Sequence, residues 1–239
     1  MITESFLKIE KLHFSYGGAR ILRGVSLDLF KGDVVCIIGP NGAGKTTMLR
    51  TISGLERPTS GQILFDGNRM DGLSPKKILS AGISLVPEQG RLFPDMTVFE
   101  NLMMGAYLRN DRKNIMKDLD VVYRYFPRLG ARARQRAGSL SGGERQMAAV
   151  GRALMSEPKV LLMDEPSSGL APQLVSMVGQ IVLDINKDGI SVLLVEQNAD
   201  MALNVSRYGY ALEQGRVSLE GETTELISHP RIKKTYLGI

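Results

Sequence analysis

The sequence predicts an α/β fold in which an antiparallel β layer and a helical subdomain accompany a core of parallel strands. From Val160 onward, short apolar runs alternate with helical patterns, as in a parallel sheet flanked by helices. Residues 7–30 alternate between apolar and polar side chains in the way of antiparallel strands. A helical stretch interrupts the core sequence. We therefore expect a single domain, 1–239, with a helical subdomain inserted at about 95–155.

Runs of apolar and β-branched residues predict the strands. In chain order these runs are 7–9, 12–16, 21–29, 34–38, 62–65, 83–86, 160–163, 191–195, 208–212 and 216–219, the last two forming a hairpin. Helical spacing of apolar side chains predicts helices at 46–52, 97–107, 115–126, 147–154 and 174–185, followed by two short helices at the C-terminus. Thr97 with Glu100, and Ser141 with Glu144, have the spacing of capping boxes.

A glycine-rich loop between a predicted strand and a predicted helix fits the pattern G-x-x-x-x-G-K-[ST]. Glycines let successive backbone N–H groups approach phosphate oxygens, and the helix N-terminus adds a partial positive charge. We expect Lys45 to reach the β- and γ-phosphates of a nucleotide and the Thr46 hydroxyl to hold Mg²⁺. The predicted fold is thus a P-loop NTPase core, and its phosphate-binding residues are Gly39, Pro40, Asn41, Gly42, Ala43, Gly44, Lys45, Thr46 and Thr47.

Two adjacent carboxylates follow a buried strand at Asp164 and Glu165. In a parallel sheet both would lie at the carboxyl edge, beside a P-loop that leaves a neighbouring strand. Asp164 is expected to bind Mg²⁺, and Glu165 to orient or deprotonate an attacking water. The alternative interpretation is a pair of surface carboxylates.

Three other features have a functional and a purely structural interpretation. Ser141, Gly142 and Gly143 open a helix with bare N–H groups that a phosphate could approach, or they form a simple cap. Tyr16 could stack on a base or be a half-buried strand residue. A run of arginines could bind phosphate or be a solvated surface: Arg128, Arg132, Arg134 and Arg136.

Composition is ordinary for a soluble globular protein, with 43% hydrophobic and 23% charged residues. The net charge of +5 owes much to the arginine run and is weak evidence for an anionic partner. We expect neither a signal peptide nor a membrane span. The single Cys36 excludes a disulfide framework and fits a reducing cytosol. His13 and His229 have no ligand-like neighbours.

With its P-loop, Leu140–Glu144 and Asp164–Glu165 in this order, the chain resembles an ABC-type ATPase from about Leu7 to Gly238. The segment Leu140-Ser141-Gly142-Gly143-Glu144 looks like the signature motif of that superfamily. The resemblance implies a head-to-tail dimer that sandwiches two ATP molecules, each P-loop facing Ser141 and Gly143 of the other chain. It also implies that Tyr16 stacks on adenine.

Three positions depart from the common pattern. Glu88, followed by Gln89, stands where the loop between the lobes usually has a glutamine, and either could serve that loop. Gln197 replaces a histidine that usually contacts the γ-phosphate, and Ala171 replaces an aspartate. An amide can hydrogen-bond a phosphate but cannot shuttle a proton.

Four further segments resemble the second ATPase of bacterial branched-chain amino acid importers, a subfamily in which this glutamine is usual. These segments are 86–88, 169–172, 195–199 and 236–238.

The resemblance implies an ATP-hydrolysing importer subunit on the cytoplasmic face of the membrane, without nucleic acid as a partner. Its expected partners are permease subunits, an identical or homologous ATPase and, indirectly, a substrate-binding protein. Large apolar residues after the loop between the lobes are expected to form the permease groove or to fill the helical core: Leu92, Phe93, Met96, Val98, Phe99, Met103 and Met104.

Two alternatives remain. One is an ABC ATPase acting on DNA or ribosomes, although only 96 positions separate Lys45 from Ser141 and the chain holds one cassette. The other is a weakly hydrolysing regulatory subunit, which Gln197 would permit.

Overall fold

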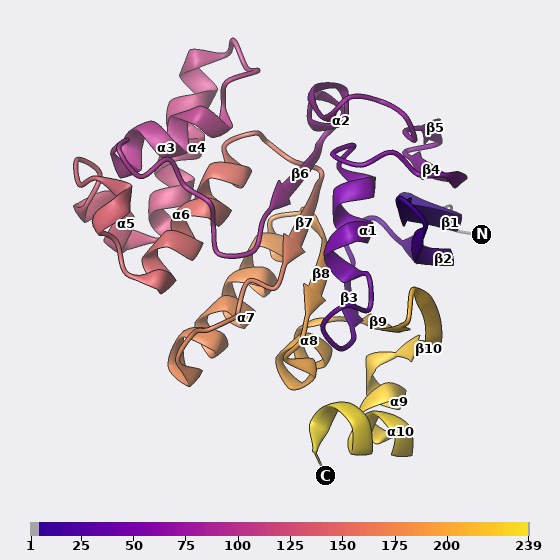
Figure 1. The fold of residues 1–239 in the computed structure, drawn as a ribbon. Coiled ribbons are helices and arrows are strands. Elements are labelled where there is room, and N and C mark those ends of the chain that lie inside the picture. The colour runs from indigo at the N-terminus through magenta and orange to yellow at the C-terminus, as the bar shows by residue number, and fades with distance from the viewer. Residues whose placement is uncertain (1–4, 239) are drawn as a thin grey trace.

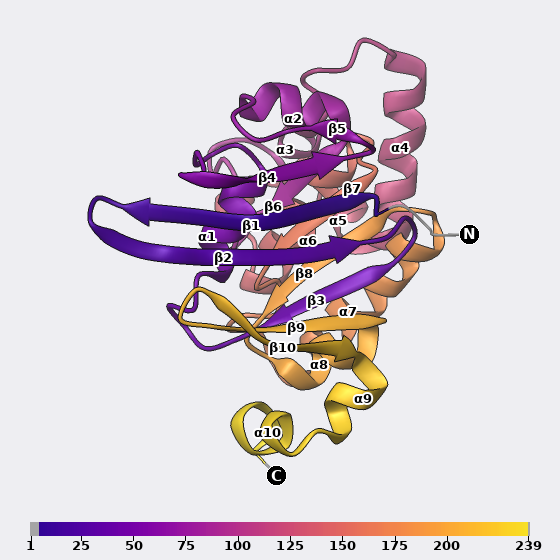
Figure 2. The same cartoon turned by 90° about the vertical axis from the view of Figure 1, so that its right-hand side faces the viewer.

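Two β-sheets organise the computed structural model, which describes residues 5–238. One sheet is antiparallel with the strand order β2-β1-β4-β5. The other has the order β10-β9-β3-β8-β7-β6, in which only the β9–β10 pair is antiparallel. In Figure 2 the long strands β1 and β2 cross in front of this second sheet. The predicted α/β class with an antiparallel layer is confirmed.

The strands follow the apolar runs of the sequence closely. Their bounds are β1 Leu7–Tyr16, β2 Ala19–Leu29, β3 Val34–Ile38, β4 Ser60–Phe65, β5 Asn68–Arg69, β6 Ile83–Val86, β7 Val160–Asp164, β8 Ser191–Glu196, β9 Tyr208–Glu213 and β10 Arg216–Glu222. The two runs expected at 7–9 and 12–16 form one strand, β1. Its register on β2 shifts between Ile9 and Leu12, where Lys11 has a φ of 46°.

Helices pack against both sheets and form a separate group between β6 and β7 (Figure 1). That group contains α3 Val98–Gly105, α4 Arg112–Tyr125, α5 Pro127–Ala131, the 3₁₀ turn η1 Ala137–Ser139 and α6 Gly142–Leu154. The other helices are α1 Lys45–Ile52, α2 Pro75–Ala81, α7 Pro172–Lys187, α8 Ala199–Val205, α9 Thr223–Ser228, α10 Pro230–Ile232 and the π-helical turn η2 Lys233–Leu237.

Both predicted capping boxes are present, at Thr97 and Ser141. The sequence analysis did not predict α2, α5, α8 or β5. None of these is longer than 7 residues, too short to display a clear hydrophobic period.

The core has two parts, one on each face of the second sheet. Alternate residues of β3 divide between them: Val34, Cys36 and Ile38 pack with the helices α6 to α8, whereas Val35 and Ile37 pack with α1 and the antiparallel sheet. Burial on both faces explains why β3 reads as a continuous apolar run. Burial also raises the pKa of the Cys36 thiol to about 12, so it is inert at neutral pH.

No helix within residues 5–238 is long and apolar enough to cross a membrane.

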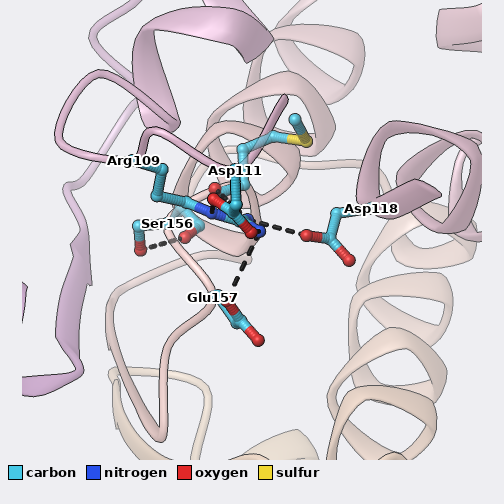
Figure 3. Close-up of polar contacts among 7 residues, drawn as sticks. Arg109, Asp111, Asp118, Ser156 and Glu157 are labelled. Atoms are coloured by element: carbon cyan, nitrogen blue, oxygen red, sulfur yellow. Dashed lines mark hydrogen bonds and ion pairs between the residues drawn. The ribbon is translucent and has the colours of Figure 1, made fainter. Parts of the chain in front are cut away.

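Arg109, which follows α3, connects several parts of the helical group through its side chain (Figure 3). Its guanidinium contacts Asp111 at 2.8 Å and Asp118 at 2.7 Å, before and within α4. It also donates to the carbonyl of Met155 at 3.0 Å and contacts Glu157 at 3.3 Å, in the segment after α6. Only 10% of the side chain is exposed. One cation therefore joins α3, α4 and the end of α6.

Replacing Arg109 by Gln is expected to destabilise the fold by about 2 kcal/mol, because the largely buried guanidinium and its charge-assisted contacts to Asp111, Asp118 and the Met155 carbonyl are lost. Chemical denaturation of the purified chain measures this loss. The matched control is Arg112→Gln, which removes an exposed arginine at the start of α4. Equal stability of the two variants would contradict the role assigned to Arg109.

Candidate functional site

The P-loop encloses one side of a cavity of about 410 Å³ at the carboxyl edge of the second sheet. Gly44, the N-cap of α1, has a φ of 106°, a conformation that favours glycine. The loop thus turns directly into a helix N-terminus, an arrangement suited to phosphate. The cavity is lined by Ile21, Asn41, Gly42, Gly44, Lys45, Thr46, Thr47, Glu88, Glu165, Ser168 and Gln197.

Lys45 lies deep in this cavity, with 4% of its side chain exposed. Its Nζ donates to the carbonyls of Gly39 at 2.7 Å and Pro40 at 3.2 Å. The same nitrogen lies 3.0 Å from Oε1 of Glu165. A buried ammonium group needs such compensation, and an entering phosphate could replace it.

Thr46 meets Asp164 across the edge of the sheet. The Thr46 hydroxyl donates to Oδ1 of Asp164 at 3.0 Å. The expectation that the P-loop leaves a strand neighbouring the Asp164 strand is wrong, because β8 lies between β3 and β7. Thr46 and Asp164 still come together, because the carboxyl ends of all three parallel strands lie at the same edge of the sheet.

The Thr46–Asp164 pair fits Mg²⁺, which prefers oxygen ligands and usually keeps several waters and substrate phosphates. Within residues 5–238, no group of three or more His, Cys, Asp or Glu side chains is arranged to hold a metal. A magnesium ion here would take its remaining ligands from waters and from the phosphates of a bound nucleotide.

Glu165 is held at the mouth of the cavity by an unusual backbone. Its φ is 45°, and its N–H donates to the carbonyl of Val195 at 2.9 Å. A positive φ in a non-glycine residue costs free energy and often marks a functional position. The conformation directs the Glu165 carboxylate to Lys45.

Glu196, which the sequence analysis did not select, supports this turn. Its buried carboxylate accepts from the N–H of Ser167 at 2.9 Å and from that of Asn198 at 3.4 Å. Burial raises the pKa of Glu196, and the Ser167 hydrogen bond opposes that rise. Glu196 thus joins the segment carrying Glu165 to the segment carrying Gln197. Its place at the end of β8, one residue beyond the partner of Asp164, was the available signal.

The segment after β6 places Glu88 and Gln89 differently. Glu88 lines the P-loop cavity, whereas Gln89 is exposed. Gln89, Gly90 and Arg91 have consecutive φ values of 59°, 73° and 38°. Of the two candidates for this loop, Glu88 is the one that the fold brings to the cavity.

Arg152 of α6, also missed by the sequence analysis, holds this left-handed stretch. Its guanidinium donates to the carbonyls of Gly90 at 3.0 Å and Arg91 at 3.1 Å, and it lies over the ring of Phe93 at 5.7 Å. Burial lowers the pKa of Arg152. The helix that begins with Ser141 is thereby tied to the loop beside Glu88.

Ser141, Gly142 and Gly143 start α6 and do not line the described P-loop cavity. The Ser141 hydroxyl accepts from the N–H of Glu144 at 3.3 Å, and Glu144 accepts in return from the N–H of Ser141 at 3.0 Å. Glu144 also pairs with Arg132 at 3.2 Å. One chain therefore keeps its P-loop and this helix start in separate places.

Tyr16 ends β1 with 47% of its surface exposed, outside the lining of the cavity. Its hydroxyl donates to Oε1 of Glu56 at 3.0 Å, and Glu56 also pairs with Arg50 of α1 at 2.9 Å. Phe14 packs edge-on against the ring at 4.7 Å. The tyrosine ring thus stands beside the helix that the P-loop opens.

Comparisons with known proteins find similar sequences and similar folds. A family model described as "ABC transporter" matches residues 22–168. A relative from Pseudomonas aeruginosa, the high-affinity branched-chain amino acid transport ATP-binding protein BraG, is 43% identical over 97% of this chain and 99% of its own.

Solved structures are also similar. The ADP conformation of MJ1267, an ATP-binding cassette of an ABC transporter, matches with a TM-score of 0.87 and 29% identity, covering 99% of this chain and 100% of that one. A dimeric structure of MJ0796, described as a bacterial ABC transporter cassette, matches with a TM-score of 0.78 and 26% identity, covering 91% and 98%.

Replacing Asp164 by Asn is expected to stabilise the nucleotide-free chain. Burial raises the pKa of Asp164 from 3.8 to about 6, so the folded state loses stability as the pH rises from about 4 to about 6. At neutral pH the ionised group costs about 2 to 3 kcal/mol. Asparagine keeps an acceptor for Thr46 without the charge.

Thermal unfolding without nucleotide measures this gain, which should appear at about pH 7.5 and shrink by more than half at about pH 4.5. The control is the exposed Asp95→Asn. A melting temperature for Asp164→Asn no higher than that of the control at neutral pH would contradict the burial cost.

Proposed function

Since this chain belongs to the ABC transporter family and is an ATPase of that family, we propose that it energises the import of branched-chain amino acids. The main structural support for this proposal is the cavity in which Lys45, the Thr46–Asp164 pair and Glu165 converge. Supporting the substrate class is the name of the P. aeruginosa relative, which matches nearly the whole chain.

In the proposed reaction, ATP binds with its phosphates along the P-loop from Gly39 to Thr47. The phosphates then bind the ammonium group of Lys45 in place of its present partners, the loop carbonyls and Glu165. Glu165 is then free to orient and deprotonate the water that attacks the γ-phosphate in line. Bound Mg²⁺, held through Thr46 and Asp164, would neutralise phosphate charge. Glu88 and Gln197 line the same cavity, and we assign them to contacts with the water or the γ-phosphate.

We further propose that two such chains, identical or homologous, pair head to tail. In one chain Ser141, Gly142 and Gly143 do not line the P-loop cavity, so we assign a second chain to bring these N–H groups to ATP. The dimeric MJ0796 cassette supports this assembly. Tyr16, beside α1, is assigned to the adenine ring.

Permease subunits would bind on the helical group. The apolar residues proposed for this contact fall into two sets. Val98 is fully buried, Met96 is half-buried, and Leu92 and Met103 pack against the core, so these four form the less accessible set. Phe93, Phe99 and Met104 are 45%, 38% and 37% exposed. These last three, here named the apolar patch, are the ones available to a partner.

This assignment places the protein on the cytoplasmic face of a membrane, with permease subunits, a companion ATPase and an indirectly acting substrate-binding protein. DNA or ribosomes would be the partners of the alternative class of ABC ATPase.

Replacing Glu165 by Gln is expected to leave ATP binding within about threefold and to lower hydrolysis at least 100-fold, because the general base is lost. Nucleotide titration and phosphate release by the assembled complex measure the two effects. The control is the exposed Glu220→Gln. Unchanged hydrolysis in Glu165→Gln would remove Glu165 from this role. Phosphate release by the wild-type complex that scarcely exceeds that of a reaction without protein would instead favour the weakly hydrolysing regulatory subunit.

Replacing Phe99 and Met104 of the apolar patch by Asp is expected to abolish co-purification of permease subunits from gently solubilised membranes of the native host. ATP binding by the isolated chain should persist, because both side chains are exposed. The control is Met177→Asp on α7, where a methionine is 41% exposed. Intact assembly of the double variant would exclude the patch, and recovery of ribosomes or DNA-bound proteins by the wild type would overturn the importer function.

A further inference from the structure

The turn between β9 and β10 braces the P-loop. The N–H of Gly215 donates to the carbonyl of Ala43 at 3.0 Å, and its carbonyl accepts from the N–H of Arg23 at 2.8 Å. A Cβ at this position would lie 2.0 Å from the carbonyl oxygen of Ile21. The turn is thus wedged between the P-loop and β2.

The end of β9 also contacts the first residue of the P-loop. A Cβ on Gly39 would lie 2.4 Å from the carbonyl oxygen of Leu212, so the two backbones touch. Gly39 in turn offers one of the carbonyls that hold Lys45. A displacement of residues 212–215 would therefore reach the first residue of the P-loop and its middle.

Glu213, within this bracing segment, is bound by the C-terminal segment 230–238. Nη2 of Arg231 lies 2.5 Å from Oε2 of Glu213, and the Tyr236 hydroxyl donates to Oε1 at 2.9 Å. Burial and the bond to Glu213 raise the pKa of Tyr236, so its hydroxyl keeps its proton at neutral pH. Both carboxylate oxygens have a partner from the C-terminal segment.

The C-terminal segment is itself anchored. Ile232 is fully buried in the core part that contains α8, and Tyr236 and Leu237 pack against it. At the start of α10, His229 Nδ1 accepts from the N–H of Arg231 at 3.2 Å. Arg231 and Tyr236 therefore hold Glu213 from a fixed position.

A crevice of about 550 Å³ separates these groups from the P-loop. Gly39, Pro40 and Gln197 line it together with Glu213 and Arg231. Gln197 also lines the P-loop cavity, so the crevice and the P-loop cavity have this residue in common. A carboxylate at this place would repel phosphates, and Arg231 neutralises it.

We propose that the C-terminal segment positions the P-loop for nucleotide through Glu213, with Arg231 and Tyr236 as positioning residues. Two effects follow from one ion pair: the bracing turn is fixed, and a negative charge near the phosphates is compensated. The inference rests on the assignment of the P-loop cavity as the ATP site, and it requires no permease.

The test measures binding of a fluorescent ATP analogue to the purified chain, together with basal hydrolysis. Arg231→Gln leaves the Glu213 carboxylate without its counterion, and its dissociation constant for the analogue should rise about threefold. Glu213→Gln with Arg231→Gln removes both charges but keeps an acceptor for the Tyr236 hydroxyl, which still holds the turn, so affinity should return to within about twofold of wild type. Turnover at saturating ATP should not change, so KM moves and kcat does not.

Controls separate this mechanism from a loss of folding and from a wrong site assignment. The control Arg216→Gln removes an exposed arginine from the same hairpin and should bind the analogue as wild type does. Tyr236→Phe removes one donor to Glu213 without altering charge and should weaken binding less than Arg231→Gln does. If Arg231→Gln lowers the melting temperature, Arg231→Lys keeps the charge and should bind the analogue as wild type does. Equal weakening in Arg231→Gln and the double variant, or wild-type affinity in Arg231→Gln, would overturn the proposal. Failure of the wild-type chain to bind the analogue would instead overturn the ATP site.

Discussion

The buried ammonium group of Lys45 imposes the main constraint on the site. A charged group that is only 4% exposed needs oxygen partners on several sides. Three segments of the chain either supply these oxygens or hold the residues that supply them. The P-loop folds back to offer the carbonyls of Gly39 and Pro40. Glu165 adopts a left-handed backbone, fixed by the end of β8, to offer its carboxylate. The compensation is replaceable, which suits a site that exchanges these contacts for phosphate oxygens.

The helical group obeys a different constraint, since it must hold its own shape while remaining connected to the site. Arg109 gathers three of its parts around one cation. Arg152 links α6 to the loop beside Glu88 through two backbone carbonyls, where three successive residues have positive φ. Strain of that kind persists only where surrounding contacts determine it. The link joins α6 to the loop beside the cavity through direct hydrogen bonds.

Much of the site was predictable because its chemistry is local in sequence. The P-loop, with its strand and helix, lies within residues 34–52, and the carboxylates follow directly on a buried strand. Residues that act by supporting others were missed for the opposite reason. Glu196 and Arg152 contact segments 29 and 62 positions away, and no local pattern reveals such partners. The strand order was also misjudged, since β8 enters the sheet between β3 and β7.

By itself, the sequence determined the fold class, the positions of the strands and long helices, and the residues able to handle phosphate and metal. These properties follow from hydrophobic period, glycine placement and side-chain chemistry, which are written along the chain. Tertiary structure alone decided that Glu88 rather than Gln89 enters the cavity and which apolar residues of the helical group remain exposed. It also brought Arg231 and Tyr236 to Glu213, from 18 and 23 positions away. These contacts depend on how the helices and strands pack against one another. Residues that are distant in sequence determine that packing, so no local sequence pattern predicts it.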